Sequence, residues 1–361
     1  MAQTPVTVLT GYLGAGKTTL LNRILSEEHG KKYAVIVNEF GEIGIDNDLV
    51  VGADEEVFEM NNGCVCCTVR GDLIRVVQGL MKRQTRSGGG FDGIVIETTG
   101  LADPGPVAQT FFVDDEVRAK AKLDSVTTVV DAKHIELRLS DSREAREQIA
   151  FADQIVLNKT DLVPEPELQA IEARLRRLNP LAPIHRAQRS NVPLEAILGR
   201  GGFDLERITT LEPEFLNPAH GQPGHVHDDD CEHDHHHHHD HVHDDDHDGQ
   251  EDHEHHHHDH VHDDDIKGVA LRLEKPVDPN KVTAWLNDLL ARQGPDILRA
   301  KGILDVAGED RRLVFQAVHM ILEGDFQRPW KAGEDRTSRM VFIGRNLDEA
   351  LLRVGFASCA A

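Results

Sequence analysis

Cysteine, aromatic residues and long apolar runs are all scarce in this chain. Of its 361 residues, five are cysteine and 4% are aromatic. Five cysteines are too few and too clustered for a disulfide framework, and their odd number favours reduced thiols. No run of about 18 apolar residues occurs, so we expect no transmembrane helix and no membrane partner. The N-terminus lacks the basic and apolar segments of a signal peptide, so we expect a soluble cytoplasmic protein.

Basic charge is scarce as well. The chain has 39 Lys and Arg against 63 Asp and Glu, a formal net charge of −24. Nucleic-acid-binding domains generally present a basic face, so we expect no nucleic-acid partner. Much of the negative charge lies between His225 and Asp265, where there are 17 acidic residues, 18 of the 23 histidines and no Lys or Arg. We call this segment the His/Asp tract; the rest of the chain has a net charge of only −7.

Short apolar runs alternate with helix-like stretches through the first half of the chain. Continuous runs of this kind are typical of strands buried on both faces of a parallel sheet. Between them, residues such as Leu20, Leu21 and Ile24 recur at helical spacing. The pattern predicts an α/β domain with a mostly parallel sheet over residues 1–207. The runs are Val6–Leu9, Ala34–Val37, Ile94–Ile96, Val126–Val130 and Ile155–Leu157.

The pattern changes after residue 207. Residues 208–266 contain several prolines and the His/Asp tract, which has almost nothing apolar to bury, so we expect a disordered linker. Residues 267–361 return to apolar patterning, with strands expected near Ile303–Val306, Leu313–Val318 and Met340–Ile343. This part predicts a smaller C-terminal α+β domain with a mostly antiparallel sheet.

The strongest motif is Gly11–Thr18, which matches the phosphate-binding pattern G-x-x-x-x-G-K-[ST] after an apolar run and before a helical pattern. Its glycines let successive backbone N–H groups point at phosphate oxygens, to which the helix N-terminus adds its dipole. We expect Lys17 to reach the β- and γ-phosphates and the Thr18 hydroxyl to ligate Mg²⁺. The alternative is a glycine turn without a ligand. The expected phosphate-binding residues are Gly14, Ala15, Gly16, Lys17, Thr18 and Thr19.

A second motif, Asn158-Lys159-Thr160-Asp161, selects the base. It follows an apolar run, where the carboxyl end of a strand faces the ligand crevice of an α/β sheet. The Asp161 carboxylate can accept hydrogen bonds from both N1–H and the 2-amino group of guanine, a pair that adenine lacks. We therefore expect Asn158, Lys159 and Asp161 to bind GTP rather than ATP.

A third segment, Glu97-Thr98-Thr99-Gly100, ends another apolar run. We expect Glu97 to hold Mg²⁺ or its water shell, together with Lys17 and Thr18 as the catalytic set, and the Gly100 amide to sense the γ-phosphate. A solvated glutamate at a strand end is the alternative. Residue 101 is Leu, so no glutamine follows Gly100 to orient a water, and we expect slow intrinsic hydrolysis.

Three of the five cysteines, Cys64, Cys66 and Cys67, lie within four residues. Thiolates prefer Zn²⁺ and similar metals, and three protein ligands leave a fourth position open for release. A reduced cysteine cluster or a redox pair is the alternative. Glu39 and Glu42 lie in a glycine-containing loop and are candidate oxygen ligands of the same metal, unless they are simply solvated.

Together these segments resemble the CobW family of P-loop GTPases, which groups with the nickel-insertion GTPases of urease and hydrogenase. The Cys-x-Cys-Cys loop is the most specific feature, and the residues after Gly100 are similar to the YjiA-like branch. The resemblance implies a GTP-dependent metallochaperone that carries Zn²⁺, with Co²⁺ or Ni²⁺ as alternatives, to a client metalloprotein. A homodimer is also compatible with it. The matching segments are Gly11–Thr18, Asn38–Glu42, Gly63–Cys67, Glu97–Pro104, Asn158–Asp161, Phe315–Gly324 and Met340–Gly344.

The His/Asp tract allows two further interpretations. Imidazole is the commonest metal ligand, so the tract can bind several divalent ions weakly and serve as a storage arm. On this alternative the protein is a metal buffer rather than a chaperone. The tract can also be an acidic, solubilising linker. A GTPase acting on RNA or ribosomes is disfavoured, because the chain is acidic and has no basic patches.

Overall fold

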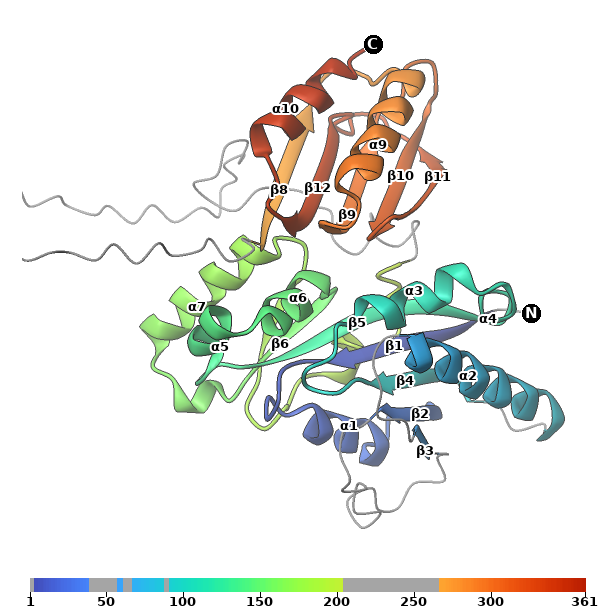
Figure 1. Ribbon diagram of the computed structural model, residues 1–361, viewed down its shortest axis with the longest axis vertical. Helices are drawn as coiled ribbons and strands as arrows, with labels where there is room; N and C mark the ends of the chain where they lie inside the picture. The colour runs from blue at the N-terminus through green and yellow to red at the C-terminus, as the bar shows by residue number, and fades with distance from the viewer. Residues whose placement is uncertain (1–2, 39–56, 61–66, 88–90, 204–265) are drawn as a thin grey trace, which may run out of the picture.

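The computed structural model describes residues 3–38, 57–60, 67–87, 91–203 and 266–361. Two layered domains lie one above the other in Figure 1, the first built around a parallel sheet and the second around an antiparallel sheet. The fold class predicted from the sequence is confirmed.

The first domain contains a seven-stranded sheet in the order β3-β2-β4-β1-β5-β6-β7. Every pairing in it is parallel, so all the strands end at the same edge. Each predicted apolar run lies within a strand. The strands are β1 (Thr4–Thr10), β2 (Tyr33–Asn38), β3 (Val57–Met60), β4 (Gly93–Glu97), β5 (Ala121–Asp131), β6 (Gln154–Asn158) and β7 (Ile184–Arg186).

Helices cover both faces of this sheet, which explains why its strands have no polar face (Figure 1). Along β4, Ile94 and Ile96 belong to the core cluster with Leu73 of α2, whereas Val95 belongs to the cluster with Leu20 of α1. The helices are α1 (Lys17–Ser26), α2 (Cys67–Ser87), α3 (Gly105–Val113), α4 (Asp115–Arg118), α5 (Ile135–Asp141), α6 (Arg143–Phe151) and α7 (Glu165–Leu178).

The C-terminal domain has a five-stranded antiparallel sheet in the order β11-β10-β9-β12-β8. Two helices cover one of its faces (Figure 1). The strand β11 was not anticipated from the sequence, because polar residues interrupt its apolar ones and none of its residues is buried. The elements are β8 (Ile266–Leu273), α9 (Pro279–Gln293), β9 (Ile297–Leu304), β10 (Arg311–Val318), β11 (Ile321–Pro329), β12 (Ser338–Arg345) and α10 (Glu349–Ser358).

The other face of the C-terminal sheet packs on the first domain. Leu298, Val318 and Val341 belong to the same buried apolar cluster as Phe151 of α6. Next to this cluster, Arg299 and Lys301 of β9 contact Asp153, just before β6, at 2.7 and 2.9 Å. The two domains therefore share one buried apolar cluster and a buried group of charges.

Candidate functional site

The Gly11–Thr18 loop joins β1 to α1 and requires glycine at two points. Gly11 has φ 141°, and a Cβ there would lie 2.2 Å from the Val129 carbonyl oxygen. Gly16 has φ 110°, and a Cβ there would lie 2.4 Å from Asn158 Nδ2. The loop is thus pressed against the ends of β5 and β6, and α1 starts at Lys17 with its first N–H groups at the carboxyl edge of the sheet. This is the geometry of an anion-binding loop.

Lys17 is buried and folds back over the loop. Its Nζ donates to the carbonyl oxygens of Gly11 at 2.8 Å and of Tyr12 at 3.3 Å. Burial lowers the pKa of Lys17, and the nearby charge of Glu97 partly counteracts this. A phosphate group in the loop would restore the charge balance around this ammonium.

Thr18 and Glu97 come together from α1 and the end of β4. Thr18 Oγ1 donates to Glu97 Oε1 at 3.1 Å, and the Glu97 side chain is buried. One residue after Glu97, Thr98 Oγ1 donates to Thr10 Oγ1 at 2.9 Å and so joins the end of β4 to the end of β1. A hydroxyl and a carboxylate are hard oxygen ligands of the kind that Mg²⁺ prefers, so the residues fit this ion.

Asn158 fixes the loop rather than pointing to solvent. Its Nδ2 donates to the Ala15 carbonyl oxygen at 2.9 Å and to Ser190 Oγ at 3.1 Å, and its Oδ1 accepts from Ser190 N at 2.7 Å. Ser190 Oγ in turn donates to the Gly16 carbonyl oxygen at 3.0 Å. Sequence analysis missed Ser190. It lies after β7 with φ 57°, and no local sequence pattern announces this conformation.

Lys159 also contacts the phosphate-binding loop. Its φ is 61°, and its Nζ donates to the Gly14 carbonyl oxygen at 2.8 Å and to Asp131 Oδ2 at 2.7 Å. Asp161 follows in a short 3₁₀ helix (Thr160–Leu162) with its side chain exposed. Asn158 and Lys159 therefore shape the loop, and the exposed carboxylate of Asp161 is available to a base.

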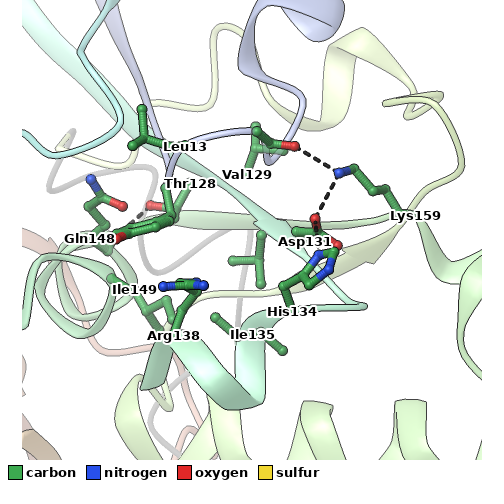
Figure 2. A pocket seen from close by; sticks show the side chains of 14 residues that line it. Leu13, Thr128, Val129, Asp131, His134, Ile135, Arg138, Gln148, Ile149 and Lys159 are labelled. Carbon is green, nitrogen blue, oxygen red and sulfur yellow. Dashed lines mark hydrogen bonds and ion pairs between the residues drawn. The ribbon is translucent and has the colours of Figure 1, made fainter. Parts of the chain in front are cut away.

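A pocket of about 490 Å³ opens beside the loop, between the end of β5 and helices α5 and α6 (Figure 2). Burial opposes ionisation of Asp131 at its rim, but hydrogen bonds from Lys159 and His134 outweigh it and lower the Asp131 pKa. Asp131 was also missed in the sequence analysis. The lining residues are Tyr12, Leu13, Gly14, Thr128, Val129, Val130, Asp131, His134, Ile135, Arg138, Ala145, Gln148, Ile149 and Lys159.

Gly100 lies directly against the phosphate-binding loop. A Cβ at this buried glycine would lie 2.7 Å from the backbone N of Leu13. Of the remaining predicted phosphate-binding residues, Ala15 is buried and Thr19 is exposed on the first turn of α1. The structure therefore brings together all the predicted nucleotide-binding residues at one edge of the sheet.

Most of the predicted metal ligands lie outside the part of the chain that the structure describes. Glu39, Glu42, Cys64 and Cys66 lie outside the described residues, and only the backbone of Cys67, the first residue of α2, is described. Among the described residues there is no group of three or more His, Cys, Asp or Glu that could hold a metal.

The ends of the neighbouring strands nevertheless show where the segment with these ligands begins. Val37 of β2 is in register with Glu97 of β4, and Asn38 is in register with Met60 of β3. Strands β2 and β3 therefore both end at the edge of the sheet that carries Glu97. Among the helices that the structure describes, none is both long enough and apolar enough to cross a membrane.

Two family models match this chain. The nucleotide-binding domain of the CobW/HypB/UreG family matches residues 5–186, and the C-terminal domain of the cobalamin synthesis protein CobW matches residues 266–360.

Individual proteins match this chain over nearly all of its length or over part of it. The zinc chaperone YjiA of Escherichia coli is 35% identical over 353 residues, which cover 98% of this chain and 97% of that protein. The zinc-regulated GTPase metalloprotein activator 1 of Schizosaccharomyces pombe is 41% identical over 216 residues, which cover 58% of this chain and 52% of that protein. The crystal structure of the Zn(II)-bound YjiA GTPase from E. coli is similar over the whole of both chains, with 32% identity and a TM-score of 0.73.

Proposed function

This chain belongs to the CobW family of P-loop GTPases, and we propose that it couples GTP hydrolysis to the delivery of zinc, or a similar divalent metal, to a client metalloprotein. The family resemblance seen in the sequence is confirmed, and with it the GTPase activity. The observation that carries the proposal is that the phosphate-binding loop, Glu97 and Asp161 lie at one edge of the sheet, the same edge at which the cysteine-containing segment begins.

Different described residues bind different parts of GTP. The loop N–H groups and the Lys17 ammonium bind the β- and γ-phosphates, and Asp161 accepts two hydrogen bonds from guanine. Thr18 and Glu97 are the residues that would hold Mg²⁺, which when bound offsets the negative charge of the phosphates. Since Leu101 follows Gly100 in place of a glutamine, hydrolysis by the isolated chain is slow.

The metal is cargo. We assign it to Cys64, Cys66 and Cys67, with Glu39 and Glu42 as candidate oxygen ligands. Relatives that bear the names zinc chaperone and zinc-regulated GTPase metalloprotein activator support zinc as the first choice. Cobalt and nickel satisfy the same kind of thiolate site, and affinity measured in solution does not select among them.

The position of these segments supports coupling between nucleotide and metal. Residues 39–56 follow β2, and residues 98–104 follow β4, its neighbour in the sheet. Contacts to a γ-phosphate order such loops in GTPases, and their release follows hydrolysis. Metal affinity then depends on the nucleotide, and by thermodynamic linkage nucleotide affinity depends on the metal.

The alternative is a metal-storage protein that acts through the His/Asp tract. The observation in its favour is the concentration of 18 of the 23 histidines between His225 and Asp265. Such a tract binds several ions weakly, independently of GTP.

Zinc stoichiometry separates the two functions. We would measure bound Zn²⁺ on the full chain and on a chain lacking residues 225–265, each with a non-hydrolysable GTP analogue and with GDP. A chaperone retains one tight, nucleotide-dependent site after the deletion. A storage protein loses its zinc with the tract and is indifferent to the nucleotide.

A further inference from the structure

Gln148 of α6 reaches the loop that follows Glu97, although the two are far apart in sequence. Its side chain is 1% exposed. Its Nε2 donates to the carbonyl oxygens of both Gly100 and Ala102, each at 3.1 Å. One buried amide thus fixes two carbonyl groups of the loop that lies against the phosphate-binding loop.

The orientation of this amide is set by its partners. Two carbonyl oxygens require donors, so the Gln148 NH₂ group must face them and its Oε1 must face away. Oε1 is buried, and it has no hydrogen-bond partner among the residues that the structure describes. Figure 2 shows Gln148 in the wall of the pocket beside the phosphate-binding loop, on the side away from Lys159.

Helix α6, which carries Gln148, is held independently of this loop. Thr128 Oγ1 of β5 donates to the Gln148 carbonyl oxygen at 2.8 Å. The adjacent Glu147 accepts from Arg143 Nε at 2.8 Å and also pairs with Arg345 of β12. These contacts anchor α6 to the sheet and to the C-terminal domain. Gln148 therefore holds the loop in place, rather than the loop holding Gln148.

Gly100 has little room to move while these bonds exist. It approaches the Leu13 backbone so closely that a Cβ would lie 2.7 Å from Leu13 N. The Thr99 carbonyl oxygen, which shares a peptide unit with the Gly100 N–H, accepts from Ala102 N at 3.1 Å. By fixing the carbonyl groups of Gly100 and Ala102, Gln148 holds this turn in place, and the turn sets the direction of the Gly100 N–H. That N–H is the donor to which we have assigned the γ-phosphate.

We propose that Gln148 is a positioning residue for GTP hydrolysis, which holds the Gly100 N–H in the direction needed to bind the γ-phosphate. This inference rests on the proposed role of Gly100. Gln148 distinguishes GTP from GDP indirectly, since only GTP has the phosphate that the positioned N–H contacts. Its removal therefore affects the GTP-bound state and the rate of hydrolysis, and leaves GDP binding at the wild-type value.

The test uses the full chain with Gln148→Met, which removes both donors at nearly constant length, and Gln148→Glu, which replaces them by an acceptor. Single-turnover hydrolysis and the affinities for GDP and for a non-hydrolysable GTP analogue are measured. Loss of two hydrogen bonds predicts a fall of about 10- to 100-fold in the single-turnover rate constant and weaker binding of the GTP analogue. GDP affinity is unchanged.

The pH profile adds a readout that a purely structural role would not move. A Glu at this position can donate again once it is protonated, so Gln148→Glu recovers hydrolysis relative to wild type as the pH is lowered. Gln148→Met shows no such recovery. If Gln148→Met does not fold, the profile of Gln148→Glu decides alone.

Asn179→Ala is the matched control. Asn179 is another fully buried amide, and its Nδ2 donates to the carbonyl oxygens of Ile149 and Ala152 at 2.8 and 2.9 Å, at the C-terminal end of α6 and away from the Gly100 loop. This variant loses stability but keeps the wild-type preference between GTP and GDP. The proposal is overturned if Gln148→Met hydrolyses GTP normally, or if Asn179→Ala loses the preference equally. A separate outcome would contradict the GTPase assignment itself, namely that the wild-type chain does not hydrolyse GTP.

Discussion

Asp153 and Arg299 form a buried ion pair that joins the two domains. Arg299 Nη2 donates to Asp153 Oδ1 at 2.7 Å, and the two side chains are 3% and 1% exposed, respectively. Arg299 Nη1 also donates to the Phe151 carbonyl oxygen at 2.9 Å, at the end of α6. The C-terminal domain is therefore tied to the strand whose other end carries Asn158.

Asp153→Asn should destabilise the protein strongly. The change leaves Arg299 and Lys301 buried without a counter-charge, which costs about 3–5 kcal/mol for pairs of this kind. Urea unfolding at neutral pH measures the loss. Asp288→Asn is a matched control, because the Asp288–Arg292 pair is solvent-exposed and worth about 1 kcal/mol or less. Equal effects of the two changes would contradict the account.

The same ion pair predicts a pH dependence. Burial opposes ionisation of Asp153, but the charges of Arg299 and Lys301 prevail and lower its pKa from 3.8 to about 2. A carboxyl whose pKa is lowered by folding stabilises the protein above its unfolded pKa, and this contribution is lost as the pH falls through the folded value. The stability advantage of wild type over Asp153→Asn should shrink by about 2 kcal/mol over that window. A constant difference would exclude the mechanism.

Lys17→Ala should abolish GTP turnover while leaving the fold intact. Among the residues that the structure describes, the Lys17 ammonium donates hydrogen bonds to backbone carbonyl oxygens of its own loop, and it is placed to bind phosphate. Loss of such a charge lowers kcat by about 100- to 1,000-fold. Phosphate release measures the rate, and circular dichroism verifies the fold. A Lys17→Ala chain that hydrolyses GTP at the wild-type rate would remove the P-loop from the mechanism.

Asp161→Asn should change the preferred base. The amide keeps one acceptor but presents a donor to guanine, so GTP affinity falls by about 1.5–3 kcal/mol. Xanthosine triphosphate, which offers the complementary group, should bind better than GTP. Competition binding with the two nucleotides checks the result, and unchanged GTP affinity would exclude Asp161 from base recognition.

Glu97→Gln should raise the Mg²⁺ concentration that hydrolysis requires. The substitution keeps the acceptor for Thr18 Oγ1 but removes the charge that would hold the ion or its water shell. The effect expected for such a change is about 10- to 100-fold in metal affinity. A magnesium titration of kcat measures it; an identical titration curve for the variant would mean that Glu97 only supports the strand end.

The sequence predicted the sheet and the phosphate-binding loop because both have local signatures. The strands buried on both faces appear as continuous apolar runs, and Gly11–Thr18 is a contiguous motif. Residues that act across long separations have no such signature: Ser190 meets Asn158, and Gln148 meets Gly100, only after the chain has folded. The edge strand β11 was missed because none of its residues is buried and its sequence has little apolar patterning.

In the mechanism we propose, the nucleotide state controls metal binding at Cys64, Cys66 and Cys67. The most direct test is the zinc affinity of the full chain measured with Mg²⁺ and a non-hydrolysable GTP analogue and again with Mg²⁺ and GDP, in wild type and in the triple Cys→Ala variant. We expect one tight site whose affinity differs between the two nucleotides by about 5- to 150-fold, and which the variant lacks. Equal affinities in both states, or a tight site that survives in the variant, would contradict the account.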